Sequence, residues 1–264
     1  MQLFSKPVLP CICGRLDLLA QSIFLIEMHA DERAEMIEKK LLLPVIFSHG
    51  IFVSMQLFDQ HHLFNTGQDK TTVFDLPDAV VRLREQLFDK PAADRLFEAL
   101  LADTPWKQEE ISVYNKTYLT PRLTAWFGDA GTEYVFSGIR HRPYHWTPGL
   151  LHVKEKVEAE AGQAFNSVLV NLYRDGRDGV GWHRDNEKEF GENPVIASVS
   201  FGDSRMFQLR HKFRKELPKV NIPLHHGSFL LMAGATQHQW EHQVPKSAKP
   251  HGPRINLTFR LVKY

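Results

Sequence analysis

The period of the hydrophobic pattern changes near Gly162, and this change limits the fold more than any other feature of the sequence. Before Gly162 the apolar residues recur at helical spacing, whereas after it they fall in short segments rich in β-branched and aromatic residues. Gly, Pro or Asp turns bound these segments, which span residues 167–173, 195–201, 205–209, 228–232 and 254–262. Helices followed by many short strands predict an α+β fold: a double-stranded β-helix (jelly roll) with N-terminal helices packed on one side.

Three helices are expected before the strands. Residues 79–88 and 94–104 carry apolar side chains at helical spacing. A third helix is expected to begin at Pro148, after Thr147 as its N-cap, and to end at Gly162.

The chain is expected to consist of an N-terminal extension and one domain that carries the sequence motifs. Residues 1–54 are expected to be an extension of uncertain structure, and residues 55–264 a single domain. The four residues that begin at Met1 recur at Met55, so Met55 is a candidate start of the functional protein.

Cysteine usage and hydropathy exclude several classes of protein. The chain has two cysteines, one residue apart, so neither a disulfide framework nor a thiolate metal site is expected, and a reducing cytoplasm is the expected location. No apolar run reaches the roughly 18 residues that a membrane helix needs, and no signal peptide is expected. We expect a monomer that does not associate with membranes.

The net charge of +1 conceals an uneven distribution. Residues 1–110 carry 11 Lys and Arg against 17 Asp and Glu, whereas residues 111–264 carry 21 against 14 and hold 10 of the 14 histidines. A basic C-terminal half attracts polyanions such as nucleic acids, and a solvated basic surface is the alternative interpretation.

The last predicted strand has one apolar and one polar face. Side chains alternate along a strand, so Ile255, Leu257 and Phe259 share a core face. The opposite face carries Arg254, Asn256, Thr258 and Arg260. This face is either exposed to solvent or lines a pocket for a small dianion, because guanidinium groups pair with carboxylates in a fixed geometry.

Two shorter polar patterns precede this last strand in the sequence. Asn171 and Tyr173 share a face at the end of a predicted strand. In the segment that follows, His183 and Asp185 point the same way and can reach a common ion. A second His-x-Asp pair, His29-x-Asp31, lies in the N-terminal extension, where the surrounding sequence favours a helix and the two side chains diverge.

A metal at His183 and Asp185 needs a third ligand, and six later histidines are candidates: His211, His225, His226, His238, His242 and His251. Two histidines and one carboxylate leave coordination positions open, an arrangement that suits non-haem Fe(II).

The order and spacing of these residues resemble the signature of the AlkB family of dioxygenases. The signature residues are Asn171-x-Tyr173, His183-x-Asp185, His242 and Arg254-x-Asn256-x-Thr258-x-Arg260. Stretches that begin at Phe127, Tyr134 and Ile196 also resemble members that repair nucleic acids. The resemblance covers residues 111–264 and does not extend to residues 1–110.

The resemblance implies a set of ligands. It implies that His183, Asp185 and His242 bind Fe(II), with His242 preferred to His238 because it lies 12 residues before Arg254. It also implies that six residues bind 2-oxoglutarate: Asn171, Tyr173, Arg254, Asn256, Thr258 and Arg260. Dioxygen is the remaining cosubstrate.

The resemblance further implies oxidative dealkylation of bases such as 1-methyladenine and 3-methylcytosine in DNA repair, with succinate and an aldehyde as products. A base in a duplex must be flipped out to reach the metal. The substrate contacts expected on this basis are a wedge at Tyr114, a phosphate contact at Arg122, a stacking pair at Tyr134 and Phe136, and polar groups at Ser137, Asn186 and Glu187. Core packing is the alternative for the aromatic pair.

Two other functions stay open. The substrate of an AlkB-like dioxygenase can be RNA or protein in place of DNA, and a jelly roll can be a binding module without enzymatic activity. Some relatives carry an acidic residue where Asn186 stands, which leaves the preferred lesion open.

Overall fold

The computed structural model describes residues 70–113, 116–132, 134–136 and 139–263. The boundary expected between residues 54 and 55 lies outside them, as do Tyr114 and Ser137. None of the helices in the described ranges is long and apolar enough to cross a membrane.

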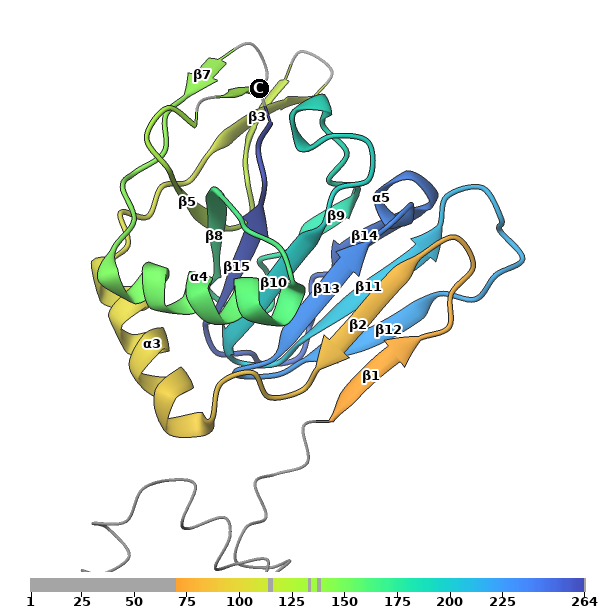
Figure 1. Cartoon of the computed structure of the whole chain (residues 1–264), viewed down its shortest axis with the longest axis horizontal. Helices are drawn as coiled ribbons and strands as arrows, with labels where there is room; N and C mark the ends of the chain where they lie inside the picture. Colours follow the sequence, from red (N-terminus) through yellow and green to blue (C-terminus); the bar gives the residue numbers. More distant parts are fainter. Residues whose placement is uncertain (1–69, 114–115, 133, 137–138, 264) are drawn as a thin grey trace, which may run out of the picture. The chain divides into compact units, whose positions relative to one another are not determined.

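Two antiparallel sheets form the framework of the domain (Figure 1). The larger sheet has the strand order β1-β2-β13-β10-β15-β8-β5. Its strands are β1 Thr71–Phe74, β2 Val80–Arg84, β5 Leu123–Gly128, β8 Ser167–Tyr173, β10 Ile196–Gly202, β13 Phe229–Ala233 and β15 Arg254–Arg260. The smaller sheet has the order β12-β11-β14-β9, with bounds β9 Val180–His183, β11 Arg205–His211, β12 Val220–Leu224 and β14 Trp240–Val244.

The remaining elements of the described ranges are two hairpins and four helical segments. The hairpins pair β3 Glu110–Val113 with β4 Lys116–Leu119, and β6 Tyr134–Phe136 with β7 Ile139–His141. The helical segments are α3 Lys90–Asp103, α4 Pro148–Ala161, the 3-10 turn η2 Lys188–Phe190 and the short α5 Thr236–Gln239.

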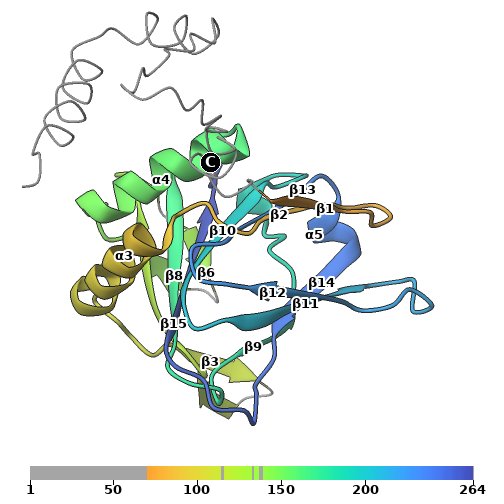
Figure 2. The ribbon, with the colours of Figure 1, turned by 90° about the horizontal axis from the view of Figure 1, so that it is seen from below.

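The helices α3 and α4 cover one face of the larger sheet, and the smaller sheet lies on its other side (Figure 2). In α4 the buried stripe is Leu150, Val153 and Val157, as the sequence predicts. Thr147 caps its first turn, and Gly162 ends it with a positive φ of 67°. The expected architecture, a jelly roll with helices on one side, is thereby confirmed.

Strand β15 separates two cores. Its apolar residues Ile255, Leu257 and Phe259 are fully buried in the core between the larger sheet and the helices. A second core lies between the two sheets and includes Phe207 and Leu209 of β11. The polar face of β15 is turned toward this inter-sheet space, which places it where a site can form.

The prediction of a helix over residues 79–88 is wrong, because β2 occupies residues 80–84. Val81 and Leu83 are buried whereas Val80 is 49% exposed, so the burial follows a period of two. Pairing with both β1 and β13 satisfies the backbone of this segment, and its β-branched residues suit a sheet. The second expected helix is present as α3, capped by Asp89.

Candidate active site

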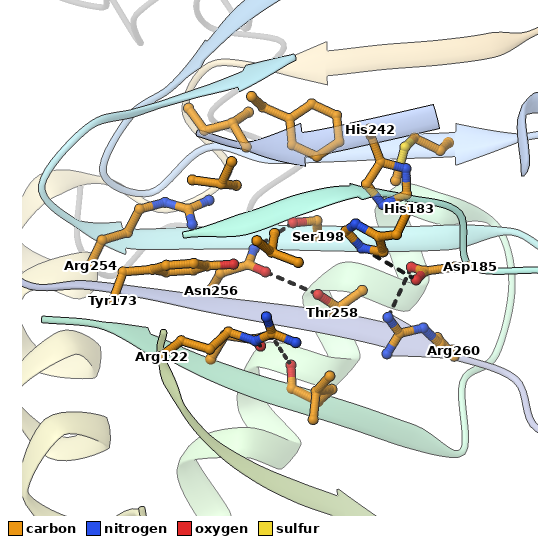
Figure 3. A pocket seen from close by; sticks show the side chains of 17 residues that line it. Arg122, Tyr173, His183, Asp185, Ser198, His242, Arg254, Asn256, Thr258 and Arg260 are labelled. Carbon is orange, nitrogen blue, oxygen red and sulfur yellow. Dashed lines mark hydrogen bonds and ion pairs between the residues drawn. The ribbon is translucent and has the colours of Figure 1, made fainter. Parts of the chain in front are cut away.

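Three side chains with metal-binding atoms converge at one end of the inter-sheet cavity (Figure 3). His183 ends β9 and lies directly opposite His242 of β14 in the pairing of the two strands. Asp185 follows two residues after His183. One ligand atom from each of the three residues lies within 4.8 Å of the others. Within the part of the chain that the structure describes, this is the one such cluster of His, Cys, Asp or Glu residues.

The protonation states of this cluster suit a divalent cation. Burial would raise the pKa of Asp185, but the nearby Arg260 guanidinium, whose Nη2 donates to Asp185 Oδ2 at 2.9 Å, holds that pKa well below its usual range. Burial lowers the pKa of His242 to about 3, so its ring is neutral near pH 7. An ionised carboxylate and a neutral imidazole are the forms that bind a metal.

Neighbouring groups hold the cluster in place. Nδ1 of His183 lies 2.8 Å from the Gly181 carbonyl oxygen, and Nε2 faces the Asp185 carboxylate, 3.9 Å from its Oδ1. The backbone N–H of Asp185 donates to Oε1 of Gln237 at 3.0 Å. Gln237 is fully buried on α5 and has no exposed surface. The two histidines and the aspartate therefore fit Fe(II), which takes this donor set and keeps open positions.

The polar face of β15 lines the same cavity. Arg254, Asn256 and Thr258 are all buried, so the solvent-exposed alternative does not hold for this strand. The register pairs Asn256 with Asn171 and Arg254 with Tyr173, so both polar patterns of the sequence lie side by side. The Asn256 amide donates to Ser198 Oγ at 2.6 Å, and the Thr258 hydroxyl donates to Asn256 Oδ1 at 3.0 Å.

Arg254 carries a buried charge with unused donors. Its Nη2 donates to Ser200 Oγ at 2.9 Å, and its guanidinium lies over the Tyr173 ring, 5.2 Å from the ring centre. Among the described residues, its buried Nε and Nη1 have no hydrogen-bond partner. Burial lowers the pKa of Arg254 to about 10, so the group stays charged near pH 7. A buried guanidinium with two free N–H groups fits a carboxylate ligand.

Arg122, the expected phosphate contact, lines the cavity (Figure 3). Its Nε donates to Asn171 Oδ1 at 3.0 Å. Arg122 is only partly buried, and its role as a phosphate contact stays a prediction. Together with Arg254 and Arg260 it gives the cavity three guanidinium groups against the single carboxylate of Asp185.

The residues expected to contact a base are only partly described. Asn186 is exposed, whereas Glu187 is half-buried and its Oε2 has no hydrogen-bond partner among the described residues. Burial, followed by the Asp185 charge, raises the pKa of Glu187. Tyr134 and Phe136 lie in β6, which pairs with β7 in a hairpin, and their role as a stacking pair stays a prediction.

Sequence reasoning missed several residues of the site. Ser198 and Ser200 of β10 bond Asn256 and Arg254, and Gln237 supports Asp185. The cavity wall also includes a set of apolar side chains: Leu169, Val180, Phe207, Leu224, Met232 and Val244. The alternating serines of β10 were the available signal, but only the pairing of β10 with β15 places them beside the arginine.

Comparisons with known proteins agree with this geometry. Residues 80–260 match the model of the 2OG-Fe(II) oxygenase superfamily. A bovine (Bos taurus) protein named "Alpha-ketoglutarate-dependent dioxygenase alkB homolog 3" is 47% identical over 182 residues, which cover 66% of this chain and 63% of the relative. Its human (Homo sapiens) counterpart is 45% identical with the same coverage. A human protein named "DNA oxidative demethylase ALKBH2" is 41% identical over 67% of this chain and 71% of its own length. The chain thus spans under two thirds of the first two relatives.

Proposed function

The chain belongs to the 2OG-Fe(II) oxygenase superfamily and is AlkB-like, and on that premise we propose that it oxidatively dealkylates N-alkylated nucleic-acid bases. The reaction would use Fe(II), 2-oxoglutarate and O2, and would yield succinate, carbon dioxide and an aldehyde. The observation that carries this proposal is the convergence of His183, Asp185 and His242 beside the unused donors of Arg254 in one cavity.

The metal end of the cavity is assigned to the three clustered residues. In this proposal His183, Asp185 and His242 hold Fe(II), and Arg260 keeps Asp185 ionised through their hydrogen bond. Bound iron supplies the oxidising chemistry, with 2-oxoglutarate as the source of two electrons. The protein supplies the ligand geometry and a cavity walled by apolar side chains such as Phe207 and Met232, which limits the access of water.

The cosubstrate is assigned to the face formed by β8 and β15. Figure 3 shows Arg254 and Tyr173 at one end of the cavity and Asp185 and Arg260 at the other. This separation suits a short diacid, with Arg254 at the carboxylate remote from the metal. Asn171, Asn256 and Thr258 lie along the same face.

A nucleic-acid substrate is supported by several independent features. The C-terminal half is basic, and the human relative at 41% identity is named a DNA oxidative demethylase. Glu187 offers a carboxyl oxygen without a partner among the described residues, next to the metal ligands, where it can bond the exocyclic group of a flipped base. In this proposal Asn186, Tyr134, Phe136, Tyr114 and Ser137 complete the substrate site. A monomeric state and a cytoplasmic location form part of the same proposal.

The test is 2-oxoglutarate turnover by the full chain with Fe(II), with and without oligonucleotides that carry 1-methyladenine or 3-methylcytosine. Methylated single-stranded DNA, duplex DNA, RNA and a methylated peptide are compared at equal concentration. We expect turnover to rise with methylated DNA and the methyl group to be lost. Demethylation of the peptide alone would contradict the nucleic-acid assignment, and absence of all turnover would contradict the enzyme assignment.

A further inference from the structure

Arg205 is a second buried cation behind the cosubstrate end of the cavity. It begins β11, is 3% exposed and does not line the cavity. Its guanidinium donates to three backbone carbonyls, those of Asp175, Asp178 and Pro245, at 2.8 to 3.0 Å. These bonds join the turn after β8 to the segment after β14, so one side chain fixes the outer end of the cavity.

Arg205 also contacts the cavity through a tyrosine. Its guanidinium lies over the Tyr173 ring at 5.7 Å from the ring centre, and Arg254 lies over the same ring at 5.2 Å. Tyr173 is 3% exposed and pairs with Arg254 across β8 and β15. Two buried guanidiniums thus share one aromatic ring, and a cation over a ring face is attracted to it.

The two cations repel one another in the ligand-free protein. The charge of Arg205 contributes, after burial, to the lowered pKa of Arg254. The hydrogen bonds of Arg205 within the described residues end at backbone carbonyls, so a carboxylate does not neutralise it by direct contact. Charges in a buried setting interact more strongly than in water, so an anion at Arg254 gains from both cations.

We infer that Arg205 is a positioning residue that fixes Tyr173 and strengthens the preference of the site for a ligand with a second carboxylate. The inference rests on the proposed use of 2-oxoglutarate and adds a residue outside the cavity wall. Arg205 acts in two ways: its three carbonyl bonds set the place of the Tyr173 ring, and its charge raises the affinity for an anion beside Arg254.

The test compares two five-carbon keto acids in the full chain loaded with Mn(II), which stands in for iron without turnover. 2-Oxoglutarate has the second carboxylate, whereas 2-oxovalerate has a methyl group in its place. Binding is measured by calorimetry for the unsubstituted chain and for Arg205→Met and Arg205→Lys. Arg210→Met is the matched control, because Arg210 lies on the same strand but pairs with Glu241 on the opposite face.

We expect Arg205→Met to weaken the binding of both acids, because the three carbonyl bonds are lost, and to weaken 2-oxoglutarate about tenfold more than 2-oxovalerate, so the ratio of the two affinities falls. Loss of packing alone would lower the affinity for both acids by the same factor and leave the ratio of the two affinities unchanged. Arg205→Lys keeps the charge and should keep most of the ratio while losing affinity for both acids, since an ammonium cannot replace the planar fork. Arg210→Met should change neither affinity.

An unchanged ratio in a folded Arg205→Met variant would overturn the inference. If Arg205→Met does not fold, Arg205→Lys is the deciding variant. The inference is then overturned if Arg205→Lys binds both acids with unchanged affinity, or if the ratio of the two affinities falls although the charge is kept. If the unsubstituted chain binds neither acid, the proposed function fails instead, so the two failures are distinguishable.

Discussion

The two ends of the cavity differ in how their charges are balanced before any ligand binds. At the metal end, Asp185 is paired with Arg260 at 2.9 Å, and its backbone N–H is bonded to Gln237. At the cosubstrate end, Arg254 keeps two buried donors without partners among the described residues, with Arg205 behind it. The metal end is therefore held in its binding geometry, whereas the cosubstrate end carries a charge that only an anion can balance.

This difference has an energetic meaning. A buried cation without a counter-ion costs free energy in the ligand-free state, and a dianionic ligand recovers it on binding. At the metal end, the charge of Asp185 is already balanced by Arg260, and His183 is held by the Gly181 carbonyl. Substitutions that perturb one end at a time test this difference.

The largest effect is expected from His183→Ala, which removes a ligand from the metal end. We expect 2-oxoglutarate turnover to fall about a thousandfold or more, because the open coordination geometry needs all three ligands. His183 is partly exposed, so the variant should fold with an unchanged circular dichroism spectrum. The control is His238→Ala, four residues from His242, which should retain turnover. Normal turnover by His183→Ala would refute its role as a ligand.

The next effect is expected from Arg254→Met at the cosubstrate end. It removes charge-assisted bonds of about 2–3 kcal/mol to a carboxylate, so 2-oxoglutarate affinity should fall roughly 30- to 150-fold. The affinity for Mn(II) should not change. Because the variant also removes an unbalanced buried charge, the free energy of unfolding of the ligand-free protein should stay the same or rise by about 1 kcal/mol.

Calorimetry with Mn(II) and chemical denaturation measure these three quantities. Arg210→Met is again the control. A marked loss of stability in Arg254→Met would show that the charges at the two ends are balanced alike before a ligand binds.

The sequence predicted the site better than its surroundings, for a physical reason. Alternation along one strand put Arg254 and Asn256 on a common face without any knowledge of the fold. By contrast, Ser200 lies 54 residues from Arg254 and Gln237 lies 52 residues from Asp185. Such contacts depend on strand order and register, which hydrophobic periodicity does not encode.

One error and one unforeseen contact show the same limit. Residues 80–84 satisfy a helical spacing as well as an alternating one, and only their place between β1 and β13 selects the strand. Arg122 bonds Asn171, 49 residues away, and this contact depends on the pairing of β5 with β8. In both cases tertiary contacts decide what the local sequence leaves open.

A smaller effect is expected from Gln237→Ala, which removes a hydrogen-bond partner of the proposed metal ligand Asp185. The substitution leaves the buried N–H of Asp185 without its partner and should lower the free energy of unfolding by about 1–3 kcal/mol. Support of this kind for a metal ligand is typically worth about tenfold or more in metal affinity, so Mn(II) should bind about tenfold more weakly. The control is Gln239→Ala on the same short helix. Unchanged metal affinity with reduced stability would limit Gln237 to a structural role.

The smallest effect is expected from Thr147→Ala, which perturbs neither end of the cavity. Thr147 Oγ1 accepts from the Leu150 N–H at 3.2 Å, and loss of such a cap costs about 1 kcal/mol. For a domain of this size the Tm should fall by about 2–4 °C, whereas Thr147→Ser should keep the cap and the Tm. Because α4 covers the face of the larger sheet opposite the cavity, affinities for Mn(II) and 2-oxoglutarate should both stay unchanged (Figure 2). A fall in 2-oxoglutarate affinity together with the Tm would show that the helical layer influences the cosubstrate end of the cavity.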